Sequence, residues 1–285
     1  MNKLASATIF ILVTLVSSCA QKKDYVVTIK TEYGDMVVIL FDETPKHKEN
    51  FIKLAKEGFY DSLMFHRVMQ GFMIQGGDPN SKKATPDQPL GTGGPGYQID
   101  AEFNPKFFHR KGALAAARTP NPAKASSGSQ FYIVQGTVIP QEGIDELKID
   151  QAKLNQCMQQ FMQQPENQPI IDSMRNVYYS GDMVAYKNLL VSLAPTMEAA
   201  TGIKVTREVS QEMIHAYTTV GGAPHLDGEY TVYGQVIKGI EVIDKIASQP
   251  TGAGNRPVQD IRMTVTVDEM SRKKITKEYG YEYPQ

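Results

Sequence analysis

The sequence has little of what supports covalent cross-links or metal binding. Only two cysteines occur among the 285 residues: Cys19 ends an apolar N-terminal stretch and Cys157 lies far along the chain, so no intramolecular disulfide is expected. The five histidines show neither an H-x-x-x-H spacing nor an association with cysteine. Because metal sites draw their ligands from such groups, the sequence predicts no metal site, and nothing in it requires a cofactor.

A strong charge of one sign and nucleotide-binding motifs are also absent. The formal net charge is −1, which provides no overall attraction to a nucleic acid or an anionic bilayer. The glycine-rich stretch 91–96 lacks the Gly-Lys-Ser/Thr ending of a phosphate loop, and residues 76–78 follow no G-x-G-x-x-G pattern. Ser129 is not set in the G-x-S-x-G turn of hydrolases. We therefore expect no nucleic-acid partner, no nucleotide and no serine hydrolase activity.

The long apolar run that the chain does contain lies at its N-terminus. Residues 2–18 pass from Asn2-Lys3 through an apolar stretch to two serines, directly before Cys19, which is typical of a signal peptide over 1–18 and short for a membrane span. The end, Val16-Ser-Ser-Cys19, resembles the lipobox of bacterial lipoprotein precursors. We expect Cys19 to be lipid-modified, 19–24 to be a linker, and the body to be anchored extracytoplasmically in a bacterial cell envelope, on the periplasmic face. An ordinary signal peptide that happens to contain a cysteine is the alternative.

The body of the chain has the texture of a mainly β protein. Residues 25–31 and 36–41 are β-branched and apolar around a Gly-containing turn, which predicts a hairpin, and Thr44-Pro45 opens a predicted helix over 45–57. From 59 to 136, short apolar pieces alternate with Gly/Pro-rich connections, as in a β-barrel with long loops. Similar texture returns at 218, with predicted strands over 230–237 and 261–267 and a short helix over 240–248.

A different composition interrupts this pattern between residues 138 and 217. Gln and Met become frequent, Gly becomes rare, and Leu154, Met158, Phe161 and Met162 recur at helical spacing, which predicts an inserted segment of two to four helices. We call residues 138–217 the insertion. Residues 269–285 are polar with scattered tyrosines and are expected to be a partly ordered C-terminal tail.

Four motifs occur in order along the chain and identify a family. The stretch from Phe65 to Asp78 reads Phe-His-Arg-Val-Met-Gln-Gly-Phe-Met-Ile-Gln-Gly-Gly-Asp, and it is followed by Gly112-Ala-Leu-Ala-Ala-Ala-Arg118, Gly128-Ser-Gln-Phe-Tyr-Ile133 and Leu226-Asp-Gly228. Over 25–137 and 218–268 the chain thus resembles the cyclophilin-type peptidyl-prolyl cis/trans isomerases. The resemblance implies a mainly β fold, a closed antiparallel barrel with capping helices, interrupted here by the helical insertion.

The resemblance also implies which residues act on an X-Pro bond. Rotation about this bond breaks amide resonance against a barrier of about 18–20 kcal/mol, so the catalyst must favour the twisted imide without forming a covalent bond. Arg67 would be the catalytic donor and Gln75 would position it. The substrate-binding residues implied by the motifs would be Phe72, Met73, Tyr132 and Leu226 in a proline pocket, Gln130 with the main chain of Ala117 and Arg118 along a groove, and His66, His225 and Tyr230 shaping the site.

Three positions depart from the family pattern. Tyr132 stands where many relatives carry Phe, so the proline pocket should persist with an added hydroxyl. His225 stands where cyclosporin-sensitive members carry Trp, and the chain contains no Trp, so we expect weak cyclosporin binding with catalysis retained. Tyr230 replaces a His that lies near the proline in many members.

Two functions are compatible with these residues. The first is an isomerase that acts on proline-containing polypeptides outside the cytoplasm and assists their folding. The second is a membrane-tethered chaperone or scaffold that binds unfolded chains through the insertion while the isomerase site is vestigial. The Met content of the insertion suits an adaptable binding surface, although Met can equally fill the core of a self-packed helical decoration.

Overall fold

The computed structural model describes residues 22–284. The predicted signal peptide and the predicted lipidation site Cys19 lie outside these residues. No helix in the described range is both long and apolar enough to cross a bilayer.

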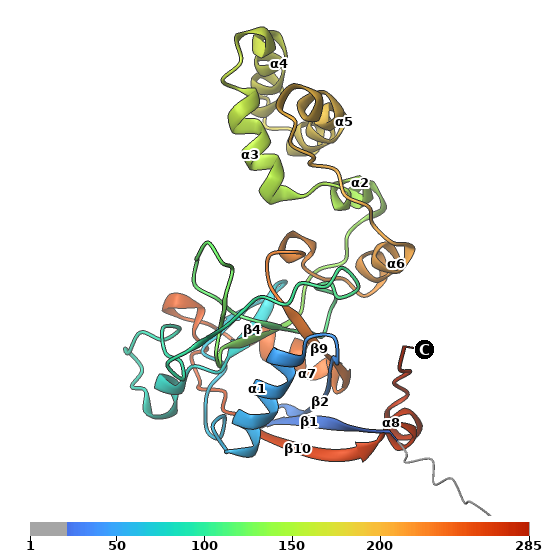
Figure 1. Ribbon diagram of the computed structural model, residues 1–285. Coiled ribbons are helices and arrows are strands. Elements are labelled where there is room, and N and C mark those ends of the chain that lie inside the picture. Colours follow the sequence, from blue (N-terminus) through green and yellow to red (C-terminus); the bar gives the residue numbers. More distant parts are fainter. Residues whose placement is uncertain (1–21, 285) are drawn as a thin grey trace, which may run out of the picture.

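The core of the molecule is an antiparallel sheet of eight strands in the order β10-β1-β2-β9-β6-β8-β4-β3, with a separate pair formed by β5 and β7. Strands β1, β2, β4, β9 and β10 of the large sheet are labelled in Figure 1. The predicted N-terminal hairpin is β1 and β2, in which Thr31 pairs with Gly34 across the turn. The strands are β1 (Lys23–Thr31), β2 (Gly34–Leu40), β3 (Arg67–Met69), β4 (Met73–Gly76), β5 (Gln98–Ile99), β6 (Ala113–Ala116), β7 (Ser126–Ser127), β8 (Phe131–Val134), β9 (Val232–Lys238) and β10 (Thr264–Ser271).

No strand ladder joins the two edge strands β3 and β10 in the part of the chain that the structure describes, so the closed barrel stays a prediction. The segments just before these strands do meet. Ser62 N and Phe65 N donate to the carbonyls of Met263 and Ile261, and Met263 N donates to Leu63 O at 2.8 Å. These bonds bring residues from the two ends of the strand order together through irregular backbone.

Side-chain alternation divides the strands between two apolar clusters. In β8, Phe131 and Ile133 enter the largest core, whereas Tyr132 and Val134 enter a second cluster on the opposite face of the sheet. Such alternation follows from the two-residue period of a strand. The largest core is completed by the apolar faces of α1 (Pro45–Lys56) and α7 (Ile240–Ala247), which contribute Phe51, Leu54, Val242 and Ile246. The second cluster is the one that bears on function.

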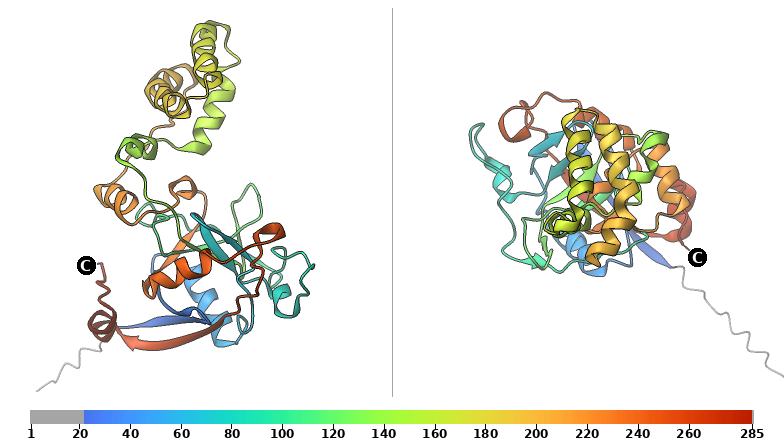
Figure 2. Two further views of the ribbon diagram at one scale, coloured as in Figure 1. Left: turned by 180° about the vertical axis from the view of Figure 1, so that it is seen from behind. Right: turned by 90° about the horizontal axis from the view of Figure 1, so that it is seen from above.

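The insertion folds into helices that project from the sheet (Figure 2). They are α2 (Ile144–Leu147), α3 (Gln151–Phe161), α4 (Gln168–Tyr179), α5 (Met183–Thr201) and α6 (Gln211–Thr219), one more than the two to four expected. α3, α4 and α5 enclose their own core around Phe161, Cys157 and Met197. α2 and α6 instead pack with Phe108 of the β-rich body. The insertion therefore has a distal three-helix part and a proximal part that rests on the body.

Both ends of the insertion meet where it leaves the body. Thr137 and Gly222 exchange backbone hydrogen bonds of 3.2 and 3.1 Å. A Cβ on Gly222 would lie 2.4 Å from the carbonyl oxygen of His109, so only glycine allows this approach.

The C-terminal segment differs from the expected partly ordered tail. β10 continues to Ser271, and α8 (Arg272–Tyr279) follows directly. Ile275 is fully buried against Val26 and Ile39, and Tyr281 and Tyr283 pack onto the same cluster. The apolar residues of this polar segment are few, but their spacing places them on one face that the sheet can bury. Arg272 N also donates to Lys22 O, so the first described residues lie beside α8, at the end of the molecule away from α3–α5 (Figure 1).

Candidate active site

A row of polar side chains crosses three strands on the face that carries the second cluster. Arg67 on β3 pairs in register with Gln75 on β4, and Gln75 pairs with Tyr132 on β8. The Arg67 guanidinium donates through Nη1 to Gln75 Oε1 at 3.2 Å and through Nη2 to Met69 Sδ at 3.0 Å. Because Arg67 and Met69 are two residues apart on one strand, their side chains share a face. The guanidinium is thus held in place while remaining partly exposed to solvent.

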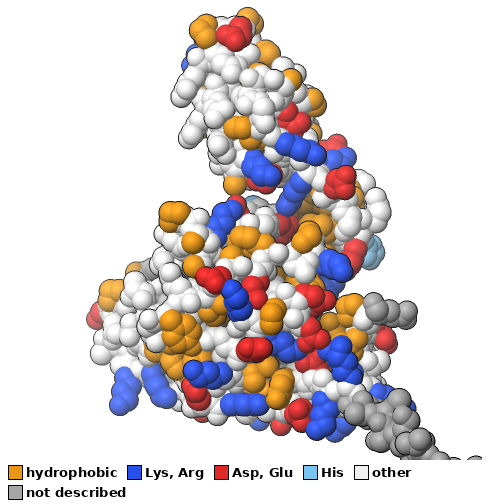
Figure 3. Space-filling model, viewed as in Figure 1, with side chains coloured by type: hydrophobic (Ala, Val, Ile, Leu, Met, Phe, Trp, Pro, Cys, Tyr) orange, Lys and Arg blue, Asp and Glu red, His pale blue; other side chains and the backbone are white. Residues whose placement is uncertain are grey.

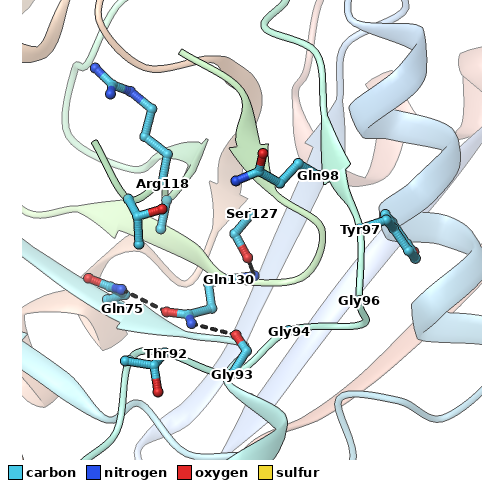
Figure 4. Close-up of a pocket in the computed structure, with 13 residues that line it drawn as sticks. Gln75, Thr92, Gly93, Gly94, Gly96, Tyr97, Gln98, Arg118, Ser127 and Gln130 are labelled. Carbon is cyan, nitrogen blue, oxygen red and sulfur yellow. Dashed lines mark hydrogen bonds between the residues drawn. The ribbon is translucent and has the colours of Figure 1, made fainter. Parts of the chain in front are cut away.

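Gln75 and Gln130 continue this row into a loop (Figure 4). Gln75 Nε2 donates to Gln130 Oε1 at 3.1 Å, and Gln130 Nε2 donates to the Gly93 carbonyl at 2.7 Å. Ser127 Oγ accepts from the backbone N–H of Gln130 at 3.1 Å. The two amide side chains therefore have their orientations fixed by partners at both ends.

An apolar patch lies next to Arg67 on the same face. We define it as Phe72, Met73, Tyr132, Leu226 and Tyr230, all members of or packed against the second cluster. Met73 and Tyr132 are buried, whereas Phe72, Leu226 and Tyr230 form a half-buried rim. The Tyr132 and Tyr230 rings meet edge to face at 5.9 Å. Residues that the sequence predicted for the proline pocket are thereby brought together from three separate motifs.

The groove predicted beside the patch coincides with a cavity of about 440 Å³. Its lining includes Gln75, Ala117, Arg118 and Gln130, as well as the glycine-rich loop 91–96 (Figure 4). Arg118 is turned partly away from it, since its Nε and Nη2 donate to the backbone and carboxylate of Glu229, both at 3.1 Å, and its guanidinium lies over the Tyr230 ring. The loop glycines match no phosphate-binding motif, so the sequence alone assigned them no role. In the structure they line the groove.

The two histidines predicted to shape the site occupy different positions. His66 is buried, lines neither the patch nor the groove, and neither of its ring nitrogens has a hydrogen-bond partner among residues 22–284. Burial lowers the pKa of His66 to about 4, so its ring is neutral near pH 7. His225 is exposed and its ring lies 5.4 Å from that of Phe72, at the rim of the patch.

Beneath the patch lies a buried hydrogen-bond network that the sequence did not reveal. Tyr132 Oη is 2.9 Å from His109 Nε2, and His109 Nδ1 is 2.9 Å from Asp227 Oδ1. Asp227 Oδ2 accepts from the Tyr217 hydroxyl of α6 at 2.7 Å. Because the carboxylate only accepts, Nδ1 carries the proton, and in the neutral tautomer Nε2 accepts from Tyr132. Asp227 lies in the Leu-Asp-Gly motif, which was the one sequence signal that pointed to this network. No motif contains His109 or Tyr217.

Comparison with known proteins decides the family. The model of the cyclophilin-type peptidyl-prolyl cis-trans isomerase family matches residues 26–182 and 199–267. The chain belongs to this family. The match confirms the resemblance of the four motifs, and it also extends over part of the insertion, which the motifs had left unmatched.

Relatives support the same activity. A Streptococcus pyogenes protein named as a bifunctional phosphatase/peptidyl-prolyl cis-trans isomerase is 34% identical over 82% of this chain, which spans 37% of that longer protein. A peptidyl-prolyl cis-trans isomerase of Staphylococcus haemolyticus is 30% identical over 85% of this chain and 89% of its own length. This cyclophilin is accordingly a peptidyl-prolyl cis-trans isomerase.

A solved structure supports the fold. The cyclophilin-type isomerase of Cryptosporidium parvum, crystallised in the presence of the dipeptide Ala-Pro, has a TM-score of 0.50 at 21% identity and covers 85% of this chain and 98% of that one. The expected antiparallel cyclophilin fold, with its helices, is confirmed.

Proposed function

We propose that Arg67 drives the isomerisation by stabilising the twisted state of an X-Pro bond whose proline ring packs on the apolar patch. The observation that carries this proposal is the position of the guanidinium. Gln75 and Met69 hold it on the face of the patch, Met69 pairs with Met73 across the strands and packs against the same cluster, and Arg67 stays partly exposed to solvent. A donor fixed in advance costs no reorganisation when the imide twists. The Arg67 guanidinium is planar and carries several N–H donors, so it can hold the prolyl carbonyl and still approach the imide nitrogen.

The groove suits the chain that flanks the proline. Its walls present backbone at Ala117 and Gly93 and amide groups at Gln75 and Gln130. Such groups bind peptide backbone without selecting side chains, which fits an enzyme that accepts many polypeptides. The Cryptosporidium parvum relative was crystallised with Ala-Pro, and we propose the same class of ligand for this chain.

Replacing the arginine tests the mechanism. We expect Arg67→Ala to lower kcat/KM for a short X-Pro peptide by about a hundredfold, as is usual when one preorganised donor is lost. Arg175→Ala, at an exposed arginine of α4, serves as the matched control and should leave turnover unchanged. Circular dichroism of both variants establishes that they are folded. Full activity in a folded Arg67→Ala protein would refute the role given to this residue.

We propose further that the enzyme works outside the cytoplasm, tethered through a lipid on Cys19, where it assists folding. The position of Lys22 supports this arrangement, because a tether leaving there would place α3–α5 at the far end of the molecule from the membrane (Figure 1). We expect Cys19→Ser expressed in a bacterium to move from the membrane fraction to the soluble fraction and to lose incorporation of labelled fatty acid. Equal membrane retention of the wild-type protein and Cys19→Ser would contradict lipid anchoring.

The scaffold alternative is favoured by one observation: exposed apolar side chains gather where α4 joins α5, at Tyr178, Tyr179, Met183 and Val184. The alternative can be tested cleanly because the distal part has a narrow base, where Asp150 N donates to Val205 O and Ile149 bridges Thr206. Replacing 151–204 by a short glycine linker should preserve short-peptide turnover if the isomerase is the main function. Lost chaperone activity with turnover intact would assign client binding to the distal helices.

A further inference from the structure

A second cavity lies where the insertion meets the isomerase site. We call it the cleft; it has a volume of about 330 Å³. One wall is formed by apolar side chains of the distal helices and the segment before them, and the other by residues of the body next to the Leu-Asp-Gly motif. The lining residues used below are Glu146, Lys187, Leu190, Val191, Arg207 and His225.

The cleft is continuous with the apolar patch through His225. This side chain lines the cleft, while its ring packs against Phe72 at 5.4 Å. Leu226, the next residue, belongs to the patch. A polypeptide with its proline on the patch therefore needs to extend only past His225 to enter the cleft, and an extended chain advances by about 3.3 Å per residue.

The walls of the cleft are fixed relative to the patch by hydrogen bonds. Arg207 Nε donates to Leu147 O at 2.7 Å and its Nη2 to Pro224 O at 3.4 Å, and Nη2 lies 3.7 Å from Asp227 Oδ2. Asp227 in turn holds Tyr217 and, through His109, the Tyr132 hydroxyl. The same arginine thus lines the cleft and belongs to the polar network under the patch.

The chemistry of the walls matches an extended peptide with an acidic residue. Leu190 and Val191 present partly buried apolar surface. Glu146 and Lys187 form an exposed ion pair of 3.0 Å at the rim, and with Arg207 the lining carries one net positive charge. Charged side chains of both signs also gather around the junction of the insertion with the body (Figure 3). Arg207 Nη1 makes no hydrogen bond to the rest of the described chain and can donate to a peptide carbonyl.

We propose that the cleft binds the segment of a polypeptide substrate that flanks the isomerised X-Pro bond, with a preference for an acidic residue in that segment. The insertion thereby extends the substrate site of the enzyme. This inference rests on the proposed placement of proline on the apolar patch.

The test compares two fluorescent peptides of about ten residues that share one X-Pro bond and differ only by Glu or Lys in the flank. Anisotropy titration of the wild-type protein should give about threefold tighter binding of the Glu peptide, the size expected for one partly exposed charge contact. Lys187→Glu should reverse the preference. Arg175→Glu makes the same change of net charge on α4, where the side chain pairs with Asp172 and does not line the cleft, and should retain it.

A second pair of variants, both on α5, tests the apolar wall of the cleft. Val191→Asp should weaken binding of both long peptides by about fivefold, whereas Val184→Asp, two turns earlier on α5 and outside the cleft, should not. Circular dichroism establishes that both variants are folded. Turnover of a tetrapeptide, too short to reach the cleft, should be unchanged in the two control variants, Arg175→Glu and Val184→Asp.

The outcomes separate the two proposals. Absence of tetrapeptide turnover by the wild-type protein would refute the isomerase mechanism, while the anisotropy pattern would still report on the cleft. Binding that ignores the flank charge, or that changes equally in Lys187→Glu and Arg175→Glu, would overturn the inference. So would a concentration-dependent dimer in analytical ultracentrifugation that Lys187→Glu dissociates while neither long peptide binds, because the cleft would then receive a second copy of the chain.

Discussion

The buried network under the patch makes a quantitative prediction about Tyr132. In Tyr132→Phe the ring keeps its shape, but His109 Nε2 loses its partner at a site where His109 is 1% exposed. Loss of the bond itself costs about 1 kcal/mol, and a buried polar atom left unsatisfied costs about 1–3 kcal/mol. We therefore expect the free energy of unfolding to fall by about 2 kcal/mol and Tm to fall by about 4–8 °C.

Tyr97→Phe is the matched control. Its hydroxyl also makes one hydrogen bond, to Asn50 Oδ1 at 2.6 Å, but the residue is 42% exposed, so water can replace the lost partner. We expect a change below about 0.5 kcal/mol. Urea and thermal unfolding followed by circular dichroism measure both variants, and tetrapeptide turnover should change less than about threefold in Tyr132→Phe because the apolar ring remains. Equal stability of the two variants would refute the energetic role of the network.

Two further predictions concern histidines. Burial lowers the pKa of His66 from 6.5 to about 4, so the folded state resists protonation; the stability that His66 contributes is complete above pH 6.5 and is lost as pH falls towards about 4. We expect the free energy of unfolding to fall by about 2 kcal/mol between pH 7 and about pH 4.5 in urea titrations. His66→Phe should remove that part of the pH dependence. An unchanged pH dependence of stability in this variant would contradict the prediction. Cyclosporin should bind weakly, and His225→Trp should tighten it by about tenfold through added aromatic contact beside Phe72. The introduced residue would be the only tryptophan of the chain, so its fluorescence reports cyclosporin binding to the variant. Equal cyclosporin affinities of the wild-type protein and the variant would refute the role given to position 225.

Much of the fold followed from local patterns. The hairpin of β1 and β2, α1 and α7 were predicted within a few residues of their observed bounds, because each combines a clear periodicity with a turn or capping signal. The C-terminal segment was misjudged for the opposite reason. Its few apolar residues, among them Ile275, gain their burial only when the distant strands β1 and β2 supply the surface.

The candidate site shows the same division. Arg67, Gln75, Met73 and Tyr132 could be proposed from sequence because they stand in dense motifs. Their common face, however, results from the register that pairs β3 with β4 and β4 with β8. A shift by one residue would send each side chain to the other face of the sheet.

By itself, the sequence determined the family, the positions of the helical insertion and the residues of the isomerase motifs, because these are carried by short contiguous segments. Only the tertiary structure decided that His109, Asp227 and Tyr217 form one network and that Lys187 and Arg207 share a cleft with His225. These residues come from separate segments, and no local pattern encodes the long-range packing that brings them together. The physical reason is that such contacts form only after strands and helices distant in the chain have closed the loops between them.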